Sequence, residues 1–209
     1  MSTHYVYTVY MIGTREILIS AAVAHLDARG LDGLTLRQIA RDAGVSHGAP
    51  LRHFASLSAL LSAVAADSFD AMTEAIRART ASLDDSPLGA LLEAGRAYVD
   101  HALANPGAYE LMFRPERLDR TDPDYLHASI AAFDQLATLT ANAQATGWRS
   151  DTPHALLTGV LWAGVHGIAS LQIQRALPAA TNTNDPAALL DVFQIDLAGL
   201  PDTTDRSNS

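Results

Sequence analysis

Cysteine and lysine are both absent from this sequence of 209 residues. Without cysteine there is no disulfide framework, no thiolate nucleophile and no cysteine metal site, and sensing through thiol oxidation is excluded. No segment resembles a signal peptide. The longest apolar run, residues 155–169, is interrupted by His166 and is shorter than the roughly 20 residues of a membrane helix, so it predicts a buried helix. We therefore expect a cytoplasmic protein with no membrane partner.

The charge of the chain is divided unevenly along its length. Since lysine is absent, all 14 basic residues are Arg, and the formal net charge is −9. Residues 1–66 hold five Arg and four acidic residues, a net charge of +1, whereas the remainder holds nine Arg and nineteen acidic residues, a net charge of −10. An acidic surface repels a polyanion. Only the N-terminal third could therefore tolerate DNA.

The apolar residues after position 13 recur with helical spacing, and no strand or internal repeat is convincing. The pattern predicts an all-α chain of about nine to ten helices. We expect a three-helix N-terminal domain over residues 14–64, joined by a fourth helix to an antiparallel bundle over residues 65–200. That fourth helix should begin near Ser56 and be followed by a separate helix over residues 67–82. Residues 1–13 and 201–209 are expected to be flexible termini.

The strongest local signal lies between Thr35 and Phe54. Thr35 as N-cap and Gln38 three residues later form a capping box, and Gly44 stops the short helix that follows. Ser46 is placed to cap another short helix that runs through Arg52. Two short helices joined by a tight glycine turn predict a helix-turn-helix, although short helices of an ordinary bundle would give a similar pattern.

A helix-turn-helix of this kind places its second helix in the major groove of DNA. The helix start at Thr35 and the side chains of Arg37 and His53 are the expected phosphate contacts. The expected base-reading residues are His47, Gly48, Ala49 and Arg52.

The stretch TLRQIARDAGVSHGAPLRHFAS (residues 35–56), followed by ALL (residues 59–61), resembles the DNA-binding signature of the tetracycline-repressor (TetR) family. The resemblance implies a homodimer that binds a near-palindromic double-stranded DNA operator. Two positions depart from the family pattern: Leu51 replaces a phosphate-contacting Tyr and Leu57 replaces a Lys. Both departures remove phosphate contacts. The full set of predicted DNA-contacting residues is Thr35, Arg37, Ser46, His47, Gly48, Ala49, Leu51, Arg52 and His53.

A second resemblance lies in residues 156–171, together with residues 105–113. These segments are similar to a TetR effector-domain class marked by Trp-x-x-Val-His-Gly, here Trp162 to Gly167. The class implies a dimeric bundle formed by the last two helices and a small-molecule ligand inside the C-terminal domain. The larger inward side chains suggest an apolar or aromatic effector, although each fits a plain core as well, His166 in particular. The candidate ligand contacts are Phe69, Met72, Tyr98, Tyr109, Met112, Phe113, Phe133, Trp162 and His166.

Catalysis has no support in the residue pattern. The eight His are scattered, no metal-ligand spacing occurs, and no Gly-rich phosphate loop is present. We expect no enzyme activity, no metal and no cofactor. The favoured hypothesis is a repressor released from its operator by a small ligand. The alternative is a TetR-fold ligand-binding or interaction module with weakened or lost operator binding, which Leu51, Leu57 and the acidity of the chain motivate.

Overall fold

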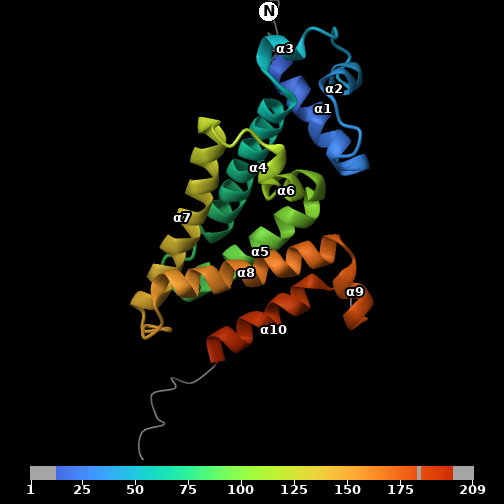
Figure 1. Cartoon of the computed structure of the whole chain (residues 1–209). Coiled ribbons are helices and arrows are strands. Elements are labelled where there is room, and N and C mark those ends of the chain that lie inside the picture. The colour runs from blue at the N-terminus through green and yellow to red at the C-terminus, as the bar shows by residue number, and fades with distance from the viewer. Residues whose placement is uncertain (1–12, 183–184, 200–209) are drawn as a thin grey trace, which may run out of the picture.

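The computed structural model describes residues 13–182 and 185–199 of the chain, without the side chains from residue 194 onward. Ten α-helices and one short 3-10 turn make up this part, and none of it is strand (Figure 1). The prediction of an all-α fold is therefore confirmed. The termini expected to be flexible lie outside the described residues, apart from Gly13.

The first three helices form a small N-terminal head: α1 (Thr14–Arg29), α2 (Leu36–Asp42) and α3 (Pro50–His53). Thr35 caps α2 as expected, since its Oγ1 accepts a hydrogen bond from the Gln38 amide at 3.1 Å. The second half of the capping box does not form, because Gln38 Oε1, which would accept from the Thr35 amide, accepts from Arg41 Nη2 instead. Gly44 takes a φ of 67° after α2, a left-handed value that favours glycine.

The second helix of the pair starts later than the sequence predicts. Residues 47 and 48 form a turn after Ser46, and α3 begins at Pro50. Proline has no N–H to donate and is best accommodated in the first turn of a helix. The carbonyl of Ser46 is instead satisfied by the Ala49 amide at 2.9 Å, within the turn. Helix α3 is therefore a single turn with proline as its first residue.

Helix α4 (Leu57–Thr80) corrects the expectation of two helices in this region. It is one continuous helix of 24 residues, capped by Ser56, whose Oγ accepts from the Ala59 amide at 3.1 Å. Its N-terminal part contributes Leu60 and Leu61 to the core of the head, and its C-terminal part contributes Phe69 and Met72 to the core of the body. A single rigid element thus joins the two (Figure 1).

The body is an antiparallel set of longer helices packed around α4. Prolines begin four of them, because a proline in the first turn loses no helical hydrogen bond. Helices α5 and α7 pack on α4, α8 crosses α5 and α7, and α10 lies along α8 (Figure 1). The elements are α5 (Pro87–Ala104), α6 (Pro106–Met112), the 3-10 turn η1 (Pro115–Arg117), α7 (Pro123–Ala145), α8 (His154–Ile173), α9 (Ala176–Thr181) and α10 (Pro186–Gly199).

Helix α8 is longer and less buried than its apolar run predicts. It has 20 residues and is long and apolar enough to span a membrane by length and composition alone. Only 28% of its most apolar 18-residue stretch is buried in the protein. One face packs against α5, α7 and α10. The opposite face leaves Leu156, Val160 and Leu171 exposed, and Val192 of α10 is exposed as well. The expectation of a buried helix therefore holds for only one face of α8 within a single chain.

Candidate DNA-binding surface and ligand cavity

The predicted DNA contacts lie at the start of α2 and in and before α3. Eight of the nine are exposed to solvent, and Leu51 has the most exposed large apolar side chain of the described residues, at 64%. The exposed residues are Thr35, Arg37, Ser46, His47, Gly48, Leu51, Arg52 and His53. Their side chains are therefore accessible to a partner without any rearrangement of the head.

Ala49 differs from the other eight, because it is only 8% exposed. It is the N-cap residue of α3, next to the buried Pro50. Its methyl group belongs to the core of the head and offers little surface to a base edge. Of the four residues predicted to read bases, His47, Gly48 and Arg52 remain accessible.

Helix α3 is anchored to the head at both of its ends. Pro50 is fully buried at the start, and Phe54, which follows the helix, is 5% exposed. The guanidinium of Arg15 on α1 lies over the Phe54 ring, 5.6 Å from its centroid, where a cation–π attraction fastens α3 to α1. These contacts fix the direction of a helix that is too short to be stable alone.

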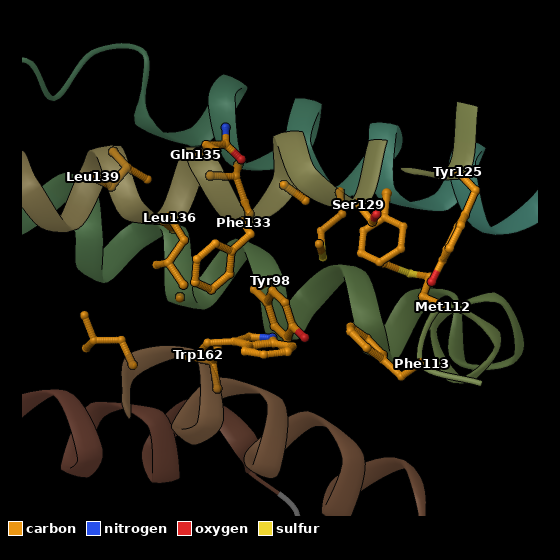
Figure 2. Close-up of a pocket in the computed structure, with 18 residues that line it drawn as sticks. Tyr98, Met112, Phe113, Tyr125, Ser129, Phe133, Gln135, Leu136, Leu139 and Trp162 are labelled. Atoms are coloured by element: carbon orange, nitrogen blue, oxygen red, sulfur yellow. The ribbon is translucent and has the colours of Figure 1, made fainter. Parts of the chain in front are cut away.

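A cavity of about 260 Å³ lies in the body between α4, α5, α6, α7 and α8 (Figure 2). Its walls are mostly apolar, and six of the lining side chains are aromatic. Concave apolar sites with a few polar groups are typical of small-molecule binding. Seven of the nine residues predicted from the sequence line it: Phe69, Met72, Tyr98, Met112, Phe113, Phe133 and Trp162.

The cavity opens to solvent between α7 and α8. Phe133 on α7 and Trp162 on α8 are the two exposed lining residues, at 43% and 38%. Their rings meet edge to face, with centroids 6.0 Å apart. A ligand that enters here must pass between or beside these two rings.

Tyr109 and His166, the other two predicted contacts, lie behind the wall rather than in it. The hydroxyls of Tyr98 and Tyr109 are 3.1 Å apart, and His166 Nδ1 lies 3.2 Å from the first and 2.8 Å from the second. Only Tyr98 of the three borders the cavity. The three polar atoms form a triangle between α5, α6 and α8, and the two hydroxyl protons can make two hydrogen bonds within it at a time.

Burial decides the protonation of this triangle. It lowers the pKa of His166 and raises the pKa of Tyr98 and of Tyr109. A neutral His166 can accept a hydroxyl proton at Nδ1 and direct its Nε2–H toward Ser170 Oγ, 3.4 Å away. The triangle is therefore neutral, and it offers no ion to a ligand.

Sequence reasoning missed most of the wall that α7 provides. Tyr125, Ser129, Ala132, Leu136 and Leu139 line the cavity at spacings of three or four residues, which is the period of one helix face. That period was visible in the sequence. Which face of α7 turns inward, however, depends on its packing against α4 and α5.

Two family models match the chain. Residues 18–64 match the model of the tetR family of bacterial regulatory proteins, and residues 91–194 match the model of a tetracyclin repressor-like C-terminal domain. The chain belongs to the TetR family. It is accordingly a transcriptional regulator with a helix-turn-helix DNA-binding head. The narrower Trp-x-x-Val-His-Gly class stays a prediction.

Individual relatives agree with this family. The HTH-type transcriptional regulator BetI 2 of Chromohalobacter salexigens is 39% identical over 83 residues, a match that spans only 38% of this chain and 40% of that protein. A protein of unknown function from Rhodococcus sp. RHA1 is 32% identical, with a TM-score of 0.75 over 92% of this chain and 100% of that one. A TetR transcriptional regulator from Streptomyces coelicolor is 26% identical, with a TM-score of 0.57 over 88% and 98% of the two chains.

Proposed function

We propose that this TetR-family protein is a cytoplasmic repressor that binds a near-palindromic operator as a homodimer and leaves it when a small apolar or aromatic ligand fills the body cavity. The observation that carries the proposal is the course of α4. This one helix holds Leu60 and Leu61 in the core of the head, and it lines the cavity with Phe69, Met72 and Ile76. A ligand that displaces its C-terminal half acts on the head without an intermediate hinge.

The dimer is proposed from the unpaired apolar surface of α8 and α10. A head with one short recognition helix reads only a few base pairs, and two heads spaced one helical turn apart, about 34–36 Å, give an operator-length site. The exposed side chains on these helices include Leu156, Val160, Leu171 and Val192. Packing them against a second copy would cover the apolar face that a single chain leaves in water.

The test is a linked pair of titrations. An operator selected from random DNA is titrated with protein, with and without a ligand found by screening for cavity binding. The ligand is titrated in turn into free and operator-bound protein. Coupling between two sites is reciprocal, so each partner should weaken the other by the same factor. Failure to select any preferred DNA would rule out repression by this mechanism.

One observation favours the alternative, a ligand-binding module with weak operator affinity. Leu51 is exposed and apolar where the family has a phosphate-contacting Tyr, and Leu57 is partly buried against the core of the head. Neither side chain can contact a phosphate through a charge or a hydrogen bond. The selection experiment separates the two hypotheses, because the module would enrich no sequence.

A further inference from the structure

Within the described part of the head, Leu51 is the only large apolar side chain that is exposed. The other exposed side chains of this kind among the described residues all lie on α7, α8 or α10 of the body. Helix α3 lies at the opposite end of the molecule from α8 and α10 (Figure 1). Leu51 therefore does not belong to the surface proposed for the dimer, and its exposure needs another explanation.

The packing of α3 fixes the direction in which Leu51 extends. Pro50 and Phe54 are buried and lie on one face of the helix, four residues apart. At 3.6 residues per turn, Leu51 follows Pro50 by about 100° around the helix and Arg52 by about 200°. Arg52 thus lies opposite the buried face, and Leu51 lies beside Arg52. Whatever Arg52 contacts is also within reach of Leu51.

The neighbours of Leu51 in the sequence are polar or small where they are exposed. They include His47, Gly48, Arg52 and His53. A partner protein would require a larger continuous apolar patch than one leucine provides. The major groove of DNA fits this surface better, since its base edges carry polar groups and one apolar group, the C5-methyl of thymine.

Resting on the operator binding proposed above, we infer that Leu51 reads thymine, by packing against its C5-methyl group in the major groove of each half-site. Arg52 adjoins Leu51 on α3, and successive base pairs are about 3.4 Å apart. The thymine should therefore lie within about two base pairs of the base that Arg52 reads. Leucine in place of the family's Tyr then exchanges a phosphate contact, which carries no sequence information, for a base contact, which does.

Replacement of thymine by deoxyuridine tests the inference, because this base lacks only the methyl group. An operator is first selected with the full-length natural protein, and each thymine is then replaced in turn, at the same place in both half-sites. Binding is measured by fluorescence anisotropy at one salt concentration, since phosphate contacts make the affinity depend on salt. One such replacement should weaken binding about fourfold per half-site, or about 15-fold for both, because burial of one methyl group is lost in each.

The variant Leu51→Ala assigns the methyl contact to one residue. Leu51 is 64% exposed, so its truncation leaves the core of the head in place. The variant should bind the thymine and deoxyuridine operators equally well. A methyl group that acted only through the shape of the DNA would still matter in the variant. The control is Leu126→Ala, the same change at an exposed position of α7, which should keep the full preference for thymine.

Three outcomes would overturn the inference and leave operator binding intact. Unchanged affinity for every deoxyuridine operator would mean that no thymine methyl is contacted. An equal loss in the natural protein and in Leu51→Ala would assign the methyl to another residue. A sensitive thymine far from the base whose preference is lost in Arg52→Ala would place Leu51 elsewhere on the DNA. Failure to select any operator would contradict the proposed function itself, and the inference with it.

Discussion

The backbone amide of Gly107, in the first turn of α6, donates to Asp27 Oδ1 of α1 at 2.9 Å. A Cβ atom at Gly107 would lie 2.5 Å from the Leu26 carbonyl carbon and 2.6 Å from the Asp27 nitrogen. The body thus touches the head backbone to backbone, at a point where only glycine fits. This is a second contact between the two parts, besides α4.

Gly107→Ala should therefore weaken the contact between α6 of the body and α1 of the head. Both neighbouring groups are backbone and cannot move aside cheaply, so we expect the free energy of unfolding to fall by about 1–3 kcal/mol. Urea denaturation measures this loss. The matched control is Gly89→Ala in the first turn of α5, where the added Cβ meets only the mobile side chain of Ser86. Equal stability of the two variants would mean that α1 and α6 are not held at this distance in solution.

Arg52→Ala should remove sequence preference while the fold stays intact. Arg52 is exposed on α3, and a bidentate contact from Arg to guanine contributes about 1–3 kcal/mol of discrimination. Arg37→Ala is the comparison, because loss of a phosphate contact should weaken operator and scrambled DNA alike. Binding of both variants to both DNAs decides between the roles. Unchanged discrimination in Arg52→Ala would exclude it as a base reader.

Gly167→Leu should break the proposed dimer without unfolding the chain. A Cβ at Gly167 meets nothing within 4 Å in a single chain. If a second copy packs on this face of α8, the larger side chain should overpack the interface by about 1–3 kcal/mol and raise the dimer dissociation constant about 10- to 100-fold. Sedimentation measures the dissociation constant. Ala141→Leu, at an exposed position of α7, is the control. Identical dimerisation of both variants would place the interface elsewhere.

Acid should destabilise the protein through its partly buried histidines. Burial lowers the pKa of both His101 and His166 below the ordinary value of 6.5. The unfolded chain therefore binds more protons than the folded one in this range, so stability is complete above about pH 6.5 and falls as the pH drops through the folded-state pKa values.

The variant His166→Asn tests one of the two contributions. The amide oxygen of the new Asn can accept the hydrogen bond that the Tyr109 hydroxyl makes to Nδ1 in the natural protein. An amide does not titrate in this pH range. The fall in urea stability between about pH 7.5 and pH 5 should be smaller in this variant than in the natural protein. The exposed His127 on α7 provides the control substitution, His127→Asn, which should leave the pH dependence unchanged. A dependence that is the same in all three proteins would exclude His166 as a source.

Much of the fold follows from local signals that packing does not override. Pro87, Pro106, Pro123 and Pro186 begin helices because proline is compatible with the first turn alone. A local signal of this kind gave a wrong prediction at Asp67. The sequence suggests that a helix starts there, but Asp67 lies inside α4. An exposed Asp inside a helix lowers the stability of the helix only slightly. The buried residues on both sides of Asp67 keep this part of the chain helical.

The cavity could be predicted only in part, because long-range packing decides which of its side chains face inward. Large apolar residues such as Met72 and Phe113 are inward candidates on any helix, so the sequence identified them. Gln135 and Ser129 carry no such signal, because polar residues usually face water. Their inward position depends on the packing of α7 against α4, a long-range contact that helical periodicity does not contain.

The length of α4 converts small movements into large ones. At 1.5 Å per residue its 24 residues extend about 36 Å, so a tilt of about 5° at the cavity end displaces the other end by about 3 Å. Two subunits that tilt in opposite directions would change the separation of their heads by about 6 Å, against a groove spacing of about 34 Å that DNA does not adjust freely. A small ligand in the cavity could thus decide whether both heads of a dimer reach the same face of the double helix.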